Sequence, residues 1–294
     1  MVTRVAVVGP GRVGTTLAMA LPAPAYRVVA VAGRGRPSLE AFAGRLPGAL
    51  VDSVEAVACR ADLVLVCVPD DALAGVVRAV ARADGVRQGS RWVHVSGGAG
   101  TEVLRPARLA GAAVAACHPA HTFPDPDTAL AGLPGTAWAV TAARADLPWA
   151  RRLVTDLGGR PIAVDERARV LYHAGLALGS NATAAVVTLA RELLLGAGIA
   201  QPEAFLAPLA EASVRSAAAR GAGALTGPVR RGDAGTVARH LAELAQVMPE
   251  ATAPYLALSR LALRHARLAG LDPQAAQAVA DTLAAAEQQG RQER

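Results

Sequence analysis

Short apolar runs alternate with amphipathic segments through the first half of the chain. The runs that predict strands are residues 4–8, 28–32, 63–68, 92–95, 112–117, 138–141 and 161–164. Segments with helical periodicity between them cover residues 15–21, 38–45, 72–83 and 145–157. Continuously apolar strands joined by helices are typical of a parallel sheet covered on both faces.

The pattern changes after residue 164, because no later segment reads as a strand. Helical periodicity instead covers residues 166–197, 202–220, 234–246, 249–268 and 273–289. Pro202, Pro249 and Pro273 stand where a first-turn proline belongs. We therefore expect an α/β domain at residues 1–164, followed by an all-helical substrate or dimerisation domain at residues 165–294.

The helix predicted over residues 166–197 is apolar around nearly its whole circumference. In a water-soluble protein such a helix must be covered on all sides. It is long enough to span a membrane, but His173, Asn181 and Arg191 interrupt it, so we interpret it as a buried core helix and expect no membrane partner. A second subunit would supply the cover most easily, and we expect a homodimer built on the C-terminal domain.

The first strand runs directly into Gly9-Pro10-Gly11-Arg12-Val13-Gly14, which is the G-x-G-x-x-G pattern of dinucleotide-binding turns. Gly9 permits the tight turn, Gly11 lets the backbone approach a pyrophosphate, and Gly14 lets the next helix pack on the strand. The helix N-terminus, with Val13, then faces the phosphates, and Arg12 faces either phosphate or solvent. This setting predicts a Rossmann-type parallel-sheet domain that binds a dinucleotide, rather than an ordinary Gly-rich turn.

The second strand ends at a segment with two arginines and no acid. An NAD enzyme usually carries Asp or Glu about 20 residues past the glycines, where it holds the ribose 2′-hydroxyl. Here Arg34 and Arg36 occupy this region, followed by Ser38, and a guanidinium pairs well with phosphate oxygens. We expect NADP rather than NAD; the alternative is two solvated arginines in an Arg-rich chain.

Polar residues also follow three later strands, and ligands of open parallel sheets bind outside the carboxyl ends of the strands. Pro69 and Asp70 follow one strand and Ser96 follows the next, so we expect all three beside the cofactor. His118 and His121 follow a third strand, but no third ligand has credible spacing, and we expect no metal. His118 either binds substrate and relays a proton, or bonds its own loop.

Polar residues interrupt the long apolar helix as well. His173, Ser180 and Asn181 are spaced by seven and eight residues, which predicts one shared stripe. Buried polar groups must be paired or line a cavity. His173 and Asn181 therefore face the nicotinamide and substrate, or else they are paired at an interface. Tyr172 and Tyr255 are weaker candidates, since Tyr172 points about 100° away from its neighbour.

A turn-rich segment precedes the helix predicted from residue 234. Thr226, Gly227 and Arg230 offer a hydroxyl, a backbone N–H and a guanidinium near a helix N-terminus. This combination suits a carboxylate or another anion, so we expect substrate contacts there. An ordinary helix–helix loop is the alternative.

The composition narrows the possible chemistry. All 30 basic residues are Arg and none is Lys, which excludes a Schiff-base, general-acid or P-loop lysine. The net charge is +6, but the arginines are scattered and aromatic residues make up only 3%, so we expect no nucleic-acid partner. The three cysteines follow no pattern, which predicts free thiols in a cytoplasmic protein rather than a disulfide framework. The first residues already have the pattern of a strand, so we expect no signal peptide.

These segments together resemble a family that joins a Rossmann-like domain to a C-terminal helical domain of unknown function. The resemblance covers nearly the full length and rests on residues 9–14, 66–73, 94–100, 117–125, 172–181 and 224–233. More distantly, the chain is similar to 6-phosphogluconate dehydrogenase and to β-hydroxyacid dehydrogenases, which use a helix Lys followed by Asn; this chain has Asn181 but no Lys. His118-Pro119 is similar to the His-Pro of prephenate dehydrogenases, and Thr226-Gly227-Pro228 to the substrate turn of pyrroline-5-carboxylate reductases.

We therefore expect an NADP-dependent oxidoreductase that moves hydride between nicotinamide and a small carbonyl or imine substrate bearing a carboxylate. Without Lys, the proton would pass through His173 or His118, with Ser96 or Asn181 polarising the substrate. An imine needs less help, because it can enter already protonated. The alternative is a regulatory or scaffold protein that binds NADP(H) without turnover.

Overall fold

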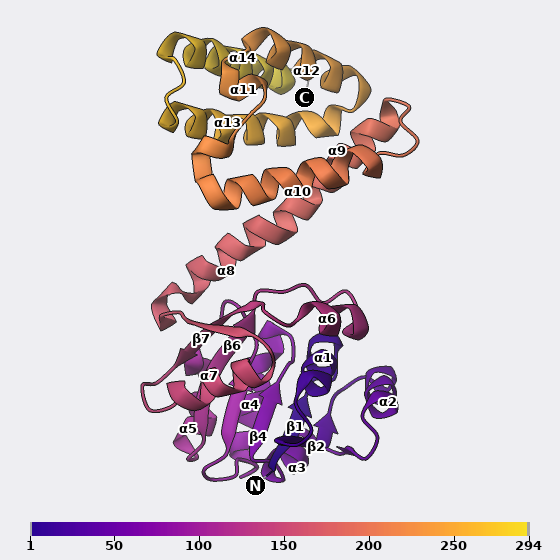
Figure 1. The fold of residues 1–294 in the computed structure, drawn as a ribbon, viewed down its shortest axis with the longest axis vertical. Helices are drawn as coiled ribbons and strands as arrows, with labels where there is room; N and C mark the ends of the chain where they lie inside the picture. Colours follow the sequence, from indigo (N-terminus) through magenta and orange to yellow (C-terminus); the bar gives the residue numbers. More distant parts are fainter. Residues whose placement is uncertain (1, 293–294) are drawn as a thin grey trace. The chain divides into compact units, whose positions relative to one another are not determined.

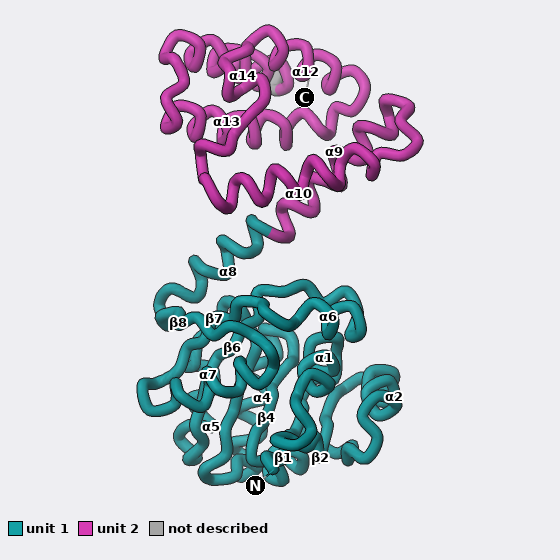
Figure 2. The backbone as a smooth tube through the Cα atoms, viewed as in Figure 1, with its two compact units in different colours: residues 1–179 teal, residues 180–294 magenta. Residues whose placement is uncertain are grey.

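The chain folds into two compact units. The computed structural model describes residues 2–292, without the side chains of residues 291 and 292. One unit runs to Gly179 and the other begins at Ser180 (Figure 2). This division lies later than the change of pattern at residue 164, because the start of the following helix contacts the sheet unit. The domain boundary at 164/165 stays a prediction.

A sheet of eight strands forms the centre of the first unit (Figure 1). The strands are β1 (Thr3–Val8), β2 (Tyr26–Ala32), β3 (Leu50–Val51), β4 (Leu63–Val66), β5 (Arg91–His94), β6 (Ala113–Pro119), β7 (Ala137–Ala142) and β8 (Arg160–Ala163). Their order is β3-β2-β1-β4-β5-β6-β7-β8, so the order reverses between β1 and β4. A switch point of this kind is where open α/β sheets bind ligands.

All neighbouring strands are parallel except β6 and β7. His118 pairs with Ala139 and Pro119 with Trp138 in antiparallel register. The chain between them forms only the short helix α6 (Pro126–Gly132) and then returns along β6 without a crossover. The α/β class is confirmed, and the sheet is parallel as expected except at this one pair.

Helices cover both faces of the sheet. One face packs against α1 (Arg12–Ala20), α2 (Arg36–Arg45) and α7 (Leu147–Asp156), and the other against α3 (Val54–Cys59), α4 (Asp70–Arg82) and α5 (Arg105–Leu109). Strand β4 is buried on both sides: Val64 and Val66 join one cluster, whereas Leu63 and Leu65 join the other. Successive strand side chains point to opposite faces, so this unbroken apolar run marks a strand between two helical layers.

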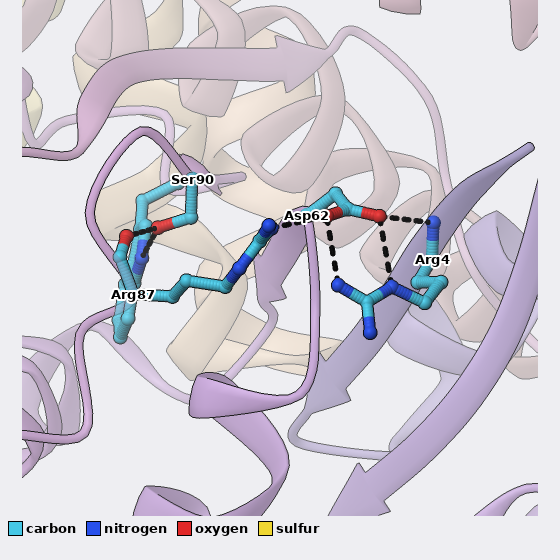
Figure 3. Close-up of polar contacts among 5 residues, drawn as sticks. Arg4, Asp62, Arg87 and Ser90 are labelled. Atoms are coloured by element: carbon cyan, nitrogen blue, oxygen red, sulfur yellow. Dashed lines mark hydrogen bonds and ion pairs between the residues drawn. The ribbon is translucent and has the colours of Figure 1, made fainter. Parts of the chain in front are cut away.

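An ion-pair network fastens the start of β1 to the segments before β4 and β5 (Figure 3). Asp62 Oδ2 accepts hydrogen bonds from Arg4 N at 3.0 Å and Arg4 Nε at 3.1 Å, and Asp62 Oδ1 accepts from Arg4 Nη2 at 3.0 Å. Arg87 also pairs with Asp62, and Ser90 Oγ donates to the Arg87 carbonyl at 2.5 Å. The hydrogen bonds from Arg4 hold the pKa of Asp62 well below its usual range.

All regular elements of the second unit within residues 180–292 are helices, as the sequence predicted. Its helices are α9 (Thr183–Gly196), α10 (Glu203–Arg220), α11 (Pro228–Arg231), α12 (Ala234–Val247), α13 (Thr252–Leu268) and α14 (Pro273–Gln292). Helices α11 to α14 share a core that includes Val237, Leu263 and Val279. Helices α9 and α10, in contrast, contribute no buried residue.

The segment predicted as one helix over residues 166–197 contains a π-helical turn at Leu178–Ala182, between α8 (Arg169–Ala177) and α9. The turn changes the helical phase, so the stripe expected from the spacing of His173 and Asn181 stays a prediction. By length and composition alone, Glu166–Gly196 could cross a membrane, which for one helix is weak evidence. None of its most apolar window is buried, so the prediction of a buried core helix is wrong within one chain.

Candidate active site

The turn between β1 and α1 has the geometry that its glycines predict. Gly9 has a φ of +96°, and a Cβ there would lie 2.7 Å from the backbone C and O of Cys67. A Cβ on Gly14 would lie 2.2 Å from the Gly9 carbonyl oxygen, whereas a Cβ on Gly11 would meet nothing within 4 Å. Two glycines are therefore required by the fold, and the third leaves open space in front of the α1 N-terminus. No side chain caps that N-terminus, which suits a pyrophosphate.

A cavity of about 680 Å³ opens from this turn along the carboxyl ends of the strands. Of the residues expected to bind the cofactor, those that line it are Gly9, Gly11, Arg12, Val13, Arg34, Ser38, Pro69, Asp70 and Ser96. Asp52 and Ser53, at the end of β3, also line it. Sequence reasoning missed these two, because β3 has only two residues and no readable periodicity.

The two arginines after β2 lie in different surroundings. Arg34 lines the cavity together with Ser38. Arg36 is not among the lining residues; its Nε pairs with Glu40 Oε1 at 2.8 Å, one turn along α2, and its side chain is 89% exposed. The structure thus supports Arg34 as the candidate phosphate ligand and places Arg36 on the solvent face of α2.

A hydrogen-bonded loop follows β5. Ser96 Oγ donates to Asp70 Oδ2 at 2.8 Å and accepts from Ala99 N at 3.1 Å. Ser96 N donates to His94 Nδ1 at 3.2 Å, and burial lowers the pKa of His94 to about 4. The neutral His94 ring therefore carries its hydrogen on Nε2, which donates to the Gly100 carbonyl at 2.9 Å. The loop is held from both ends, and the Ser96 hydroxyl is already engaged with Asp70.

His118, at the end of β6, meets two aromatic residues of α8. Its Nδ1 lies 2.9 Å from the Tyr172 hydroxyl, and its ring centroid lies 5.7 Å from that of His173. Burial, followed by repulsion from His173 and Arg169, lowers the pKa of His118 to about 4. Burial raises the pKa of Tyr172, so both partners are neutral near pH 7.

The close approach of the two histidines depends on a glycine. A Cβ on Gly97 would lie 2.5 Å from His173 Cδ2 and 3.0 Å from His118 Nε2. Of the expected catalytic residues, the first unit thus brings Ser96, His118 and His173 together. The Tyr172–His118 bond was not foreseen, although the angle between Tyr172 and His173 on the helix lets both rings reach His118.

Two charged residues at the start of the helical segment fasten it to the β5 loop. Arg169 Nη2 donates to the Ser96 carbonyl at 2.6 Å, and Arg169 Nη1 donates to Thr141 Oγ1 at 3.0 Å. Glu166 Oε2 accepts from the backbone N and the hydroxyl of Thr101, both at 2.9 Å. Neither residue was singled out from the sequence; the only available signal is a charge in the first turn of an otherwise apolar helix.

The remaining expected residues are divided between the two units. The Nε2 of His121 contacts the Ala129 carbonyl at 3.1 Å, which is a bond within its own segment. In the second unit, Thr226, Gly227 and Arg230 line one shallow hollow, and Arg230 Nη2 donates to the Ala269 carbonyl at 3.2 Å. Asn181 is exposed in the π-helical turn.

Comparison with known proteins identifies both parts of the chain. Residues 2–119 match the Rossmann-like domain family, and residues 136–262 match the domain of unknown function DUF2520. No protein of curated function matches the sequence.

Several solved structures share the fold. A Bacteroides fragilis protein provisionally named an NADP oxidoreductase is 24% identical, with 89% of this chain and 98% of that chain covered and a TM-score of 0.75. The Myxococcus stipitatus imine reductase in complex with NADP+ is 20% identical, with coverage of 89% and 94% and a TM-score of 0.65. The pyrroline-5-carboxylate reductase of Coxiella burnetii is 14% identical, with 98% of each chain covered and a TM-score of 0.56. At these identities the likeness concerns the fold.

Proposed function

We propose that this chain, whose two parts match the Rossmann-like domain family and the DUF2520 domain, is an NADP-dependent oxidoreductase. The proposed substrate is a small carbonyl or imine compound that carries a carboxylate. One observation supports it above all. The cavity runs from the glycine-rich turn along the strand ends to Ser96, and behind Ser96 the side chains of His118 and Tyr172 form a neutral hydrogen-bonded pair. Fold neighbours named as an NADP oxidoreductase and as an imine reductase in complex with NADP+ agree with this proposal.

The residues of the cavity fit NADP. The space in front of Gly11 and the uncapped α1 N-terminus would hold the pyrophosphate. Arg34 and Ser38 would hold the 2′-phosphate through a guanidinium and a hydroxyl. When bound, NADP(H) supplies or accepts a hydride at its nicotinamide.

His118 and Tyr172 would move the proton. We assign Tyr172 as the donor and His118 Nδ1 as the acceptor of their hydrogen bond, which puts the single ring hydrogen on Nε2. Within residues 2–292 no hydrogen-bond partner occupies Nε2, so it is free to donate to a substrate atom. Ser96, already bonded to Asp70, positions the loop rather than polarising the substrate. His173 and Asn181 keep their proposed place beside the substrate, and Thr226, Gly227 and Arg230 are proposed to bind its carboxylate.

NADPH oxidation against a panel of keto acids and cyclic imines tests the proposal. Tyr172→Phe removes the hydroxyl but keeps the ring, so it should lower kcat/KM with little change in the Kd for NADPH. Removal of a positioned proton donor costs about 10²–10⁴-fold in rate. NADPH binding without turnover of any panel member would instead favour a protein that senses NADP(H).

We also propose that a second copy of the chain covers α8 to α10. Their exposed apolar side chains include Leu171 at 79%, Leu178 at 69% and Leu209 at 65%. Apolar surface on this scale is unfavourable in water and marks an interaction site. The alternative cover is a membrane, which light scattering without detergent would distinguish.

A further inference from the structure

Arg169 is a buried cation that forms no ion pair with any carboxylate of the described residues. Its side chain is 0% exposed, and its two hydrogen-bonded nitrogens reach only the neutral oxygens of Ser96 and Thr141. Its Nε has no hydrogen-bond partner, and no carboxylate of the described residues forms an ion pair with it. A guanidinium does not lose its proton in proteins, so the positive charge remains in the interior. Burial of an unpaired charge is costly, which makes such a group exceptional unless it has a task.

The groups around Arg169 do not neutralise it. Those facing it or His118 are Asp70 of α4, His94 of β5, Cys117 of β6, Glu166 before α8, and Tyr172 and His173 of α8. Burial raises the pKa of the Cys117 thiol to about 12 and lowers the pKa of His94 to about 4, so both are neutral at pH 7. Only Asp70 and Glu166 are negative.

Both carboxylates accept hydrogen bonds from groups other than Arg169. Glu166 accepts hydrogen bonds from the backbone and hydroxyl of Thr101 and from Glu102 N, which disperse its charge. Asp70 is exposed at the start of α4 and accepts the Ser96 hydroxyl, and solvent screens its charge. Of these three charged groups, only Arg169 is buried, and it lies directly behind the Ser96 carbonyl and beside His118, whereas both carboxylates are exposed.

We infer that the reacting group of the substrate is a neutral carbonyl, and not a protonated imine. This inference rests on the proposed oxidoreductase function and names the substrate class of the same site. In carbonyl reduction, the carbonyl carbon gains a hydride from NADPH, which is oxidised to NADP+. The C=O π electrons move to oxygen, and that oxygen takes the proton from His118 Nε2. His118 can regain a proton from Tyr172 through Nδ1, and solvent restores the Tyr172 hydroxyl.

The sign of the charge change distinguishes the two substrate classes. Negative charge develops on a carbonyl oxygen as the hydride arrives, and a fixed cation nearby stabilises it. A protonated imine enters as a cation and loses its charge in the reaction, so Arg169 would repel the ground state and oppose its binding. A neutral imidazole donor also suits a carbonyl oxygen, whereas an iminium nitrogen has no lone pair to accept its hydrogen bond. The ease of imine reduction noted from the sequence is thus outweighed by the charge of this site.

Substrate pairs of matched shape test the inference. Wild-type protein with NADPH would be assayed on cyclopentanone against 1-pyrroline, and on 2-oxopentanoate against 1-pyrroline-2-carboxylate. We expect the carbonyl member of each pair to have the higher kcat/KM. In Arg169→Gln, the carbonyl-to-imine ratio should fall about tenfold or more, because the variant lacks the fixed cation that favours a developing negative charge and opposes a positive one. Arg169→Lys keeps the charge and should keep the preference.

Thr141→Val provides a control that removes one hydrogen bond from Arg169 but not its charge; it should leave the ratio close to that of wild type. Faster reduction of the imines by wild-type protein overturns the inference while leaving the oxidoreductase function intact. Turnover of neither class, with NADPH bound, counts against the proposed function itself, and the inference falls with it.

A measurement without substrate tests whether the positive charge of Arg169 acts on His118. Histidine-labelled protein would be titrated by NMR, with His118 assigned through a His118→Gln variant. We expect wild-type His118 to titrate well below the ordinary histidine pKa of about 6.5, and to titrate higher in Arg169→Gln than in Arg169→Lys. If Arg169→Gln does not fold, the wild-type titration still decides: a His118 pKa at or above about 6.5 shows that the cation is compensated and overturns the inference.

Discussion

Removal of the Arg34 side chain should weaken NADPH binding and leave NADH binding nearly unchanged. Arg34 lines the cofactor cavity beside Ser38, whereas Arg36 is paired with Glu40 on the solvent face of α2. A hydrogen bond to a charged group contributes about 1.5–3 kcal/mol, which corresponds to about 10- to 150-fold in Kd. Ser38 remains in Arg34→Ala, and we therefore expect the lower part of this range. Arg36→Ala is the matched control, with the same loss of charge two residues away and an expected change of less than about threefold in Kd, typical of an exposed charge.

Fluorescence titration of NADPH and NADH against wild type, Arg34→Ala and Arg36→Ala measures this difference. Both variants should keep the wild-type melting temperature within about 2 °C, because neither side chain is part of the core. Phosphate contacts are also weakened by salt, so the advantage of NADPH over NADH in wild type should shrink between low salt and 0.5 M NaCl. Equal affinity of wild type for the two cofactors, or a larger loss in Arg36→Ala than in Arg34→Ala, would refute the assignment.

Three further predictions concern the turn, the stability and the assembly. Gly9→Ala should destabilise the fold by about 1–3 kcal/mol in urea denaturation, because the Gly9 backbone has a positive φ and a Cβ there meets backbone atoms. Gly11→Ala, in contrast, should unfold at the wild-type urea concentration but bind NADPH more weakly. Asp62 has a folded pKa below its unfolded value, so its contribution is fully present above about pH 4 and is lost as the pH falls through the folded pKa. Asp62→Asn should lower the unfolding free energy at pH 7 by about 1 kcal/mol or less, since the pair is partly exposed, and the difference from wild type should be smaller at pH 2. Light scattering at low protein concentration should report twice the chain mass, and a stable monomer would show that α8 to α10 need no second copy.

The two helical candidates provide a further test. His173→Ala and Asn181→Ala should lower kcat/KM by about 10²–10⁴-fold if the side chains position or donate a proton, with NADPH affinity nearly unchanged. Full activity of both variants would show that these residues serve only the structure, and His118 and Tyr172 would then carry the proton transfer alone.

The sequence by itself determined the α/β class, the positions of most strands and the nucleotide turn. These features depend on local physics: strand β4 is apolar at every position because both of its faces are covered, and Gly9 and Gly14 stand where the turn has no room for a Cβ. The all-helical nature of the second unit was equally readable, since helical periodicity and first-turn prolines are local signals.

The tertiary structure alone decided which residues meet. The antiparallel direction of β7 and the pairing of the two-residue β3 depend on contacts between distant segments, and the sequence of a strand does not show which partner it pairs with or in which direction. The Tyr172–His118 bond joins residues 54 positions apart, and Arg169 reaches Ser96 across 73. Arg36 was predicted to bind phosphate with Arg34; it pairs locally with Glu40 and does not line the cavity, so its contact with phosphate stays a prediction. Sequence patterns report the environment of each residue along its own element, whereas the charge balance around His118 depends on four elements that only folding brings together.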